Sequence, residues 1–125
     1  MQKGSLNKVL LIGHLGQDPE VKFAKSGVAI TRFSLATNES WKDKDGNIQD
    51  KTEWHKIVMF GKMAETAGEF LKKGNLVYLE GRLKTDSWES DGVKRYSTDV
   101  VVDNWTTLGK KTEVDKQEED DSLPF

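Results

Sequence analysis

One stretch of the chain decides the fold: Thr52-Glu53-Trp54-His55-Lys56-Ile57-Val58-Met59-Phe60-Gly61. Its side chains alternate in character as those of a β-strand do, because successive strand residues point to opposite faces. One face is aliphatic apart from a histidine, and the other carries two aromatic rings with a lysine between them. The second face suits stacking on unpaired bases beside a phosphate, although aromatic residues in strands commonly belong to the core.

Strand patterns also lie on both sides of this stretch. They fall at residues 6–15, 21–23, 28–37, 76–84 and 96–105. Gly13 stands where the first strand can bend or approach another backbone closely. Two polar segments separate the later strands: residues 38–51, with a hairpin tip at residues 45–47, and a charged loop at residues 85–94.

The arrangement of these elements predicts a barrel. Between residues 61 and 75 the apolar period becomes helical, with Phe70 on the apolar face, and Gly74 marks the end of that helix. The apolar parity shifts between Ile30 and Phe33, which predicts a bulge or a sharp coil where a strand turns a barrel corner. Five main strands with one helix between the third and fourth predict an all-β OB-fold barrel. An unrelated small barrel is the alternative.

Length and composition narrow the class further. The 125 residues allow one domain, which we place at residues 1–109, with a polar tail at residues 110–125. No apolar run spans a bilayer and no signal-peptide pattern is visible, so we expect a cytosolic protein. The absence of cysteine excludes disulfides, thiolate metal sites and a cysteine nucleophile.

The net charge of −2 is unevenly distributed along the chain. Residues 110–125 hold three lysines and six carboxylates, a net −3, whereas residues 1–109 hold 16 basic and 15 acidic groups, a net +1. A near-neutral domain still attracts polyanions if its cations gather on one face, because the relevant field is local.

The candidate contact surface has four rings: Trp41, Trp54, Phe60 and Trp88. Polar neighbours surround the first and last of these in sequence, so neither has an apolar pocket to fill. Exposed large aromatics mark contact surfaces, and stacking on each ring is worth about 1–3 kcal/mol for any base. Seven cations could contact phosphates, although each of them, taken alone, could equally be a solvated surface charge. They are Lys8, Lys42, Lys56, Lys62, Lys73, Lys84 and Arg95.

Catalysis has little support in the sequence. His14 and His55 lack the spacing of a metal or acid–base site, and the glycine-containing stretches lack the Walker and dinucleotide fingerprints. Trp105 ends an apolar strand and is assigned to packing. We therefore expect no catalytic residue, no metal and no cofactor, and we retain a small hydrolase or metal enzyme as the least favoured hypothesis.

Several segments together resemble a known family. They are Asn7-Lys8-Val9 through Leu15-Gly16-Gln17-Asp18-Pro19-Glu20, Ala36-Thr37-Asn38-Glu39-Ser40-Trp41, Thr52-Glu53-Trp54-His55-Lys56 through Phe60-Gly61-Lys62, Val77-Tyr78-Leu79-Glu80-Gly81-Arg82-Leu83, and Asp120-Asp121-Ser122-Leu123-Pro124-Phe125. In this combination the chain resembles the bacterial single-stranded DNA-binding protein (SSB) family. The resemblance implies an OB-fold homotetramer wrapped by single-stranded DNA, with the four rings as base-stacking residues and His55 at a subunit contact.

The resemblance also gives the tail a role. It implies that the tip, residues 120–125, recruits replication, recombination and repair enzymes, whereas composition alone equally suits a solubilising acidic end. Only residues 106–117 separate Trp105 from Glu118, a shorter linker than is common in the family. The resemblance further implies a nucleoid-associated protein of the bacterial cytoplasm. The alternative function, from a different class of protein, is an OB-fold adaptor whose aromatic residues bind proteins and whose contact with nucleic acid is incidental.

Overall fold

The computed structural model describes residues 3–109, so the predicted tail and its tip lie outside the described residues. The elements are β1 (Val9–Leu15), β2 (Glu20–Phe23), β3 (Ala29–Lys42), β4 (Ile48–Phe60), α1 (Lys62–Phe70), β5 (Leu76–Ser90) and β6 (Val93–Gly109).

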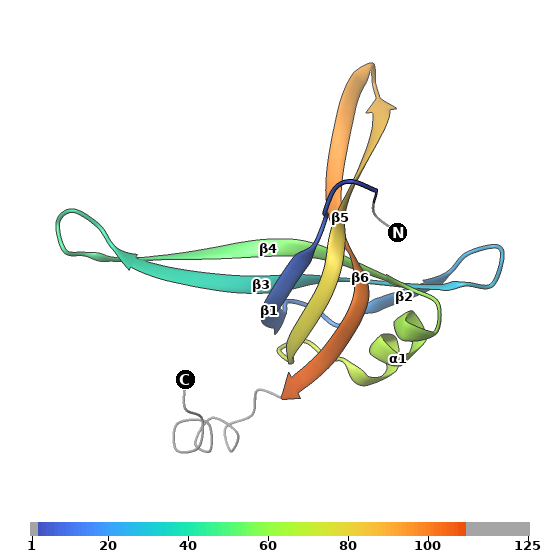
Figure 1. Cartoon of the computed structure of the whole chain (residues 1–125), viewed down its shortest axis with the longest axis horizontal. Helices are drawn as coiled ribbons and strands as arrows, with labels where there is room; N and C mark the ends of the chain where they lie inside the picture. The colour runs from blue at the N-terminus through green and yellow to red at the C-terminus, as the bar shows by residue number, and fades with distance from the viewer. Residues whose placement is uncertain (1–2, 110–125) are drawn as a thin grey trace.

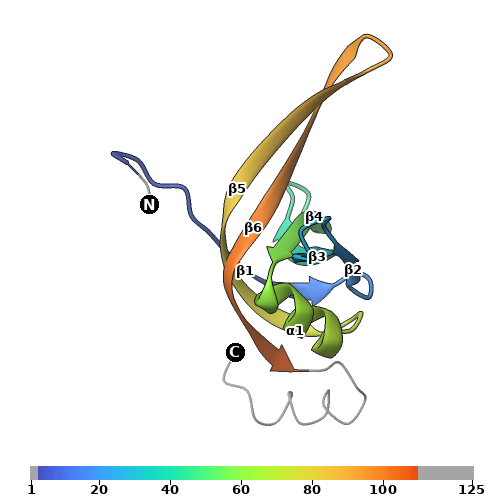
Figure 2. The same cartoon turned by 90° about the vertical axis from the view of Figure 1, so that its right-hand side faces the viewer.

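The strands close into a barrel (Figures 1 and 2). Their order is β1-β5-β6-β4-β3-β2, and a further pairing of β1 with β3 joins the ends of the five-stranded ring. Strands β4 and β6 run parallel where they meet, and the other paired strands are antiparallel. The short strand β2 extends the sheet beside β3. The predicted five-stranded OB-fold barrel with one helix is therefore confirmed.

Gly13 allows the barrel to close. It lies on β1 beside the point where β1 meets β3. A Cβ atom there would lie 2.3 Å from the carbonyl oxygen of Ala36, which is far inside van der Waals contact. The predicted close approach of two backbones at this glycine is confirmed.

Helix α1 packs on β2, β3 and β4 and contributes to the core. Ala64, Ala67 and Leu71 are buried there. Phe70, which the helical period placed on the same face, is instead 63% exposed. None of the described residues forms a helix with the length and apolarity that crossing a membrane requires.

The bulge predicted between Ile30 and Phe33 is wrong. The β3–β4 ladder is continuous through these residues, and the buried side alternates regularly. Thr31 occupies the inward position between them, fully buried, and its hydroxyl donates a 2.6 Å hydrogen bond to the carbonyl of Ala64. A pattern based on apolar residues alone does not identify Thr31 as a core residue. The register shifts lie instead in the β5–β6 ladder, where the pairing passes over Leu108 and Asp103 of β6.

Two segments predicted as polar stretches are paired strands that project from the barrel (Figures 1 and 2). The β3–β4 arm (residues 37–53) stays paired to the Lys42–Ile48 rung, and the β5–β6 arm (residues 84–99) to the Ser90–Val93 rung. The tip at residues 45–47 is confirmed as a turn. Both faces of each arm meet solvent, so the strands carry no apolar alternation that sequence could reveal.

Candidate nucleic-acid interface

The centre of the site is the outer face of β4. Strand alternation places Trp54, Lys56, Val58 and Phe60 on one side. Trp54 is 57% and Phe60 45% exposed, whereas Val58 is buried where β4 pairs with β6. Arg32 lies opposite Val58 on β3 and is exposed on this same face. Two rings and two cations therefore line the middle of the barrel surface.

Gly16 lies directly against the Trp54 ring. A Cβ atom on Gly16 would lie 2.3 Å from Cζ3 of Trp54 and 2.9 Å from Oγ of Ser34, so only a hydrogen fits there. In the same turn, Asp18 accepts a 2.8 Å hydrogen bond from the backbone N–H of Lys73. The turn after β1 thus limits the position of the Trp54 ring through Gly16, and it fixes the backbone of Lys73 through Asp18.

Two side-chain bridges connect the β4 face to the β5–β6 arm. Lys56 Nζ donates a 3.1 Å hydrogen bond to Ser97 Oγ, and Arg32 forms an ion pair with Asp99 at 3.7 Å. A hollow of about 330 Å³ lies at this junction, lined by these two cations, Asp99 and neighbouring barrel residues. The β4 face and one face of the arm form a continuous surface, which we call the junction face.

Trp88 extends the junction face along the arm. It pairs with Arg95, and Lys84 pairs with Asp99, all on the side of the arm that carries Ser97. The Trp88 ring is 47% exposed. The prediction that Trp88 lies in a loop is wrong, because the β5–β6 ladder continues past it. Its place on a paired strand fixes the direction of the ring more firmly than a loop would.

Trp41 lies apart from the other three rings. It pairs with Gln49, five positions along β3 from the Ala36–Trp54 rung. An odd number of positions places two strand residues on opposite faces, so Trp41, 46% exposed, faces away from Trp54 across the β3–β4 arm. A polymer that touches both rings has to cross the edge of the arm.

The remaining predicted cations are spread around the barrel. Lys42 lies at the outer end of β3, and Lys62 begins α1 two residues after Phe60. Lys8 is engaged elsewhere, in a 3.9 Å ion pair with Glu80. Lys56, Lys73, Lys84 and Arg95 are the predicted cations that the described geometry brings to the junction face or its edge.

Glu80 belongs to a polar network on the outer side of β5. Hydrogen bonds from Asn104 and then Tyr78 hold the pKa of the Glu80 carboxyl below its usual value, and Lys8 adds a smaller electrostatic contribution. Burial, reinforced by the neighbouring carboxylate, raises the pKa of the Tyr78 hydroxyl. Glu80 is therefore a stable anion here, and it competes with a phosphate for Lys8.

Sequence reasoning missed Arg32 and Ser97, which join the two parts of the junction face. Alternation along residues 28–37 places Arg32 outward, and this signal was available in the sequence. Its proximity to Asp99 was not, because that contact depends on how the arm leaves the barrel.

His55 occupies the opposite side of β4 from the rings. It is partly buried, and its Nε2 lies 2.9 Å from the Thr37 hydroxyl oxygen. Within residues 3–109, no group of three or more His, Cys, Asp or Glu side chains is arranged to hold a metal ion.

A closed five-stranded barrel with half-exposed aromatics on its strands and arms defines an OB-fold binding domain, a class whose members bind oligonucleotides and oligosaccharides. Residues 6–108 match the model of the Single-strand binding protein family. The chain belongs to this family, which confirms the resemblance seen in its sequence.

Two curated relatives are both called single-stranded DNA-binding protein. The one from Xanthomonas axonopodis pv. citri (strain 306) is 52% identical over 109 residues, which cover 86% of this chain and 61% of the relative. The one from Xanthomonas campestris pv. campestris (strain ATCC 33913 / DSM 3586 / NCPPB 528 / LMG 568 / P 25) is 51% identical over 109 residues, covering 86% and 63%. The matched part of the chain thus spans less than two thirds of these relatives' length.

Solved structures agree with the fold. The chain superposes on the Plasmodium falciparum SSB, solved in complex with ssDNA, with a TM-score of 0.80 and 33% identity, over 87% of this chain and 100% of that one. It superposes on a deletion mutant of the single-stranded DNA-binding protein from Thermus aquaticus with a TM-score of 0.75 and 34% identity, over 83% and 51%.

Proposed function

We propose that this chain is a non-catalytic protein that binds single-stranded DNA without sequence preference, in DNA replication, recombination and repair. The observation that supports this most directly is the junction face. There Trp54, Phe60 and Trp88 stand half-exposed, and Lys56 lies between the first two and hydrogen-bonds to the arm that carries the third. Family membership and the DNA-bound relative agree with it.

The chemistry of the face explains the preference for unpaired DNA. A base inside a duplex already stacks on its neighbours, whereas an unpaired base can place its π-face on an indole or phenyl ring. Each such stack is worth about 1–3 kcal/mol and tolerates any base. Three rings on one face therefore supply useful affinity without reading sequence.

Phosphate contacts come from the cations around the rings in this proposal. Lys56 and Arg95 lie between or beside rings, Lys84 lies along the arm, and Lys73 is joined through its backbone N–H to Asp18 in the turn that also contains Gly16. Lys42 and Lys62 extend the path outward, and Lys8 contributes when it leaves Glu80. Because phosphate binding releases counterions, affinity should fall as salt rises, with a slope of about −0.7 per contact for single strands.

A direct test compares a labelled poly(dT) oligomer with a duplex of the same length by fluorescence anisotropy. We expect tight single-strand binding that weakens with salt, and much weaker duplex binding. Equal or better affinity for the duplex would refute the proposal. Replacing Trp54 and Trp88 by alanine should abolish most single-strand binding while light scattering shows the same mass. If binding of DNA survives and contacts to proteins are lost, the adaptor hypothesis takes its place.

We also propose that the functional unit is a homotetramer with His55 at a subunit contact. In support, Leu10 and Ile12 on the outer side of β1 are each 57% exposed, although they are aliphatic and belong to a barrel strand. Contact with another copy would remove this apolar surface from water. Light scattering should give four times the chain mass, and a monomeric mass at micromolar concentration would contradict this.

For the tip, Asp120, Asp121, Ser122, Leu123, Pro124 and Phe125, we propose recruitment of replication, recombination and repair proteins in the bacterial cytoplasm, at the nucleoid. An acidic run followed by two apolar residues around a proline suits a basic pocket with an apolar centre. Deleting residues 122–125 should abolish partner capture and leave single-strand binding intact or slightly stronger. A pull-down that is unaffected by the deletion would refute this role.

A further inference from the structure

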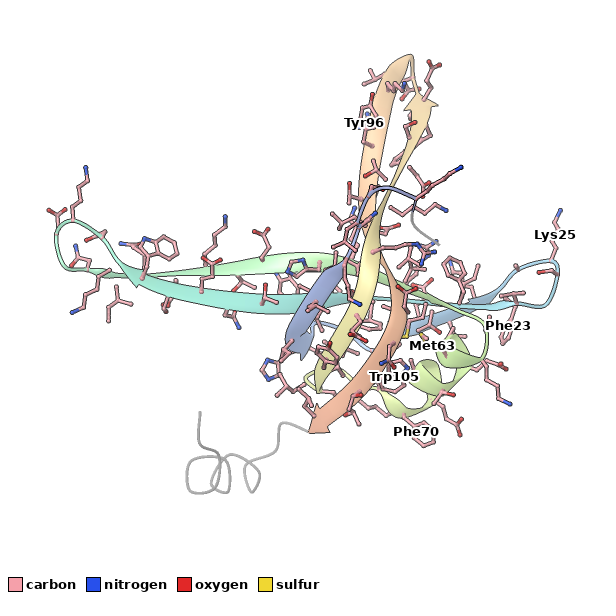
Figure 3. All side chains as sticks on the ribbon, viewed as in Figure 1. Phe23, Lys25, Met63, Phe70, Tyr96 and Trp105 are labelled. Carbon is pink, nitrogen blue, oxygen red and sulfur yellow. The ribbon has the colours of Figure 1, made fainter. Side chains whose placement is uncertain are left out.

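A further exposed ring, Tyr96, lies on the β5–β6 arm, on the face opposite Trp88. Tyr96 pairs with Ser87, one rung from the Trp88–Arg95 rung, so alternation turns its ring to the other side of the ribbon. The ring is 65% exposed. Figure 3 shows Tyr96 on the projecting arm, far from Phe70 and Trp105 at the other end of the barrel.

The surroundings of Tyr96 leave its ring open and place a cation beside it. On the same face, Thr85 and Thr98 are short side chains whose hydroxyls bond to each other at 2.8 Å. Lys94 Nζ lies 5.7 Å from the ring centroid, and Glu89 is opposite Lys94 in the ladder. A two-stranded ribbon has no further layer to cover the ring, so packing does not account for a large aromatic here.

The placement of rings on both faces of the β5–β6 arm matches their placement on the β3–β4 arm. Trp54 and Trp41 lie on opposite faces across β3–β4, and Trp88 and Tyr96 lie on opposite faces across β5–β6. A ring with an adjacent ammonium group matches the two parts of a nucleotide, a base to stack and a phosphate to neutralise. Each arm therefore has a stacking surface on both faces.

We propose that Tyr96 and Lys94 form an additional nucleotide-binding site on the reverse face of the β5–β6 arm. A single strand that stacks on Trp88 continues across the edge of the arm, stacks a base on Tyr96 and places a phosphate near Lys94. This inference rests on the proposed function and adds to it the path of the strand around the arm. It assigns single-stranded nucleic acid, rather than a second copy of the chain, to this face.

The test uses the full chain and dT oligomers of increasing length, with affinity measured by anisotropy. Tyr96→Thr removes the ring with a residue that also favours strands, and Tyr96→Phe retains it. Short oligomers that saturate the junction face should bind all three proteins alike. Long oligomers should bind Tyr96→Thr at least about fivefold more weakly and Tyr96→Phe within about twofold of the wild type, given the usual value of one stacked base.

Two charge variants test the phosphate contact. Lys94→Met should reduce the salt slope by about 0.7 for long oligomers and leave it unchanged for short ones. Glu89→Gln removes the carboxylate opposite Lys94 and should strengthen binding of long oligomers alone. Identical slopes for wild type and Lys94→Met at every length would overturn the assignment of Lys94.

The outcomes separate this site from the proposed function. If wild type binds long oligomers and Tyr96→Thr binds them equally well, the Tyr96 site is overturned and the junction face stands. If Tyr96→Thr weakens short and long oligomers alike and changes the mass by light scattering, Tyr96 is a contact between copies and the site is again overturned. If wild type binds no oligomer, both proposals fail.

Discussion

Replacing Gly16 by alanine should move the Trp54 ring without altering the ring itself. The added Cβ would lie 2.3 Å from Cζ3 of Trp54, whereas ordinary contact begins at 3.4 Å, so the indole has to retreat by about 1 Å. The atoms that have to move are the far end of the Trp54 side chain, which is 57% exposed and can move into solvent, and the Ser34 hydroxyl, which would lie 2.9 Å from the new Cβ and has only to rotate. The substitution therefore perturbs the binding surface more than the barrel.

The magnitudes of the two effects differ. An off-rotamer shift of about 30° costs roughly 0.5–1.5 kcal/mol, and a 1 Å movement needs less. Gly16 has no left-handed φ, so alanine also gains about 0.4–1 kcal/mol through the unfolded state. The free energy of unfolding should thus change by less than about 1 kcal/mol. Losing part of a stack worth about 1–3 kcal/mol should weaken poly(dT) binding by about three- to tenfold.

Gly13→Ala is the matched control. Its Cβ would meet the carbonyl oxygen of Ala36 at the same 2.3 Å, but that atom belongs to backbone at the β1–β3 closure and cannot turn away. We expect a loss of about 1–3 kcal/mol in the free energy of unfolding and normal affinity per folded molecule. Urea unfolding and anisotropy measure both quantities. If Gly16→Ala binds like wild type, or is the less stable of the two variants, the reasoning is wrong.

Three further predictions concern single side chains. Thr31→Val removes the buried bond to the Ala64 carbonyl and should lower the free energy of unfolding by about 1–2 kcal/mol, measured by urea titration. Lys56→Met should weaken poly(dT) binding for every sequence and reduce the salt slope by about 0.7, measured by titrations at several salt concentrations. Hydrogen bonds, chiefly from the backbone N–H of Asn47, lower the pKa of Asp43 from 3.8. The ionised Asp43 carboxylate therefore stabilises the turn above pH 3.8, and this stabilisation is lost as the pH falls through the lowered pKa. Protection of the amides at the tip from hydrogen exchange should fall in acid for the wild type. It should not change with pH in Asp43→Asn.

The barrel could be predicted because the pattern of apolar and polar residues along its strands indicates which side chains are buried. The two faces of strand β4 differ in chemical character, and a helical period follows the strand, so element type and order are visible without coordinates. Gly13 could also be placed, because a glycine inside a strand has few uses other than a bend or a close approach. The core position of Thr31 could not, because a buried hydroxyl that bonds to a helix carbonyl resembles a surface threonine in sequence.

The rings of the candidate site could be selected by their polar neighbours, but their grouping could not. Exposure of Trp41 and Trp88 follows from local composition. Which rings share a face depends on whether residues 38–51 and 85–94 are loops or strands. In a loop the rings would be free to meet, whereas in a ladder each is fixed to one side. The structure places Trp41 on the opposite side from Trp54, which no count of residue types reveals.

The arms explain why one small domain can carry so many exposed aromatics and still fold. The buried residues of the barrel come from β1, β3, β4, α1, β5 and β6, and the core is complete without the outer halves of the hairpins. Beyond the barrel each hairpin is held by backbone hydrogen bonds and cross-strand pairs, which do not require an apolar face. Aromatic side chains placed there are left uncovered without leaving a cavity in the core. The same separation lets substitutions on the arms change DNA binding while substitutions such as Gly13→Ala change stability.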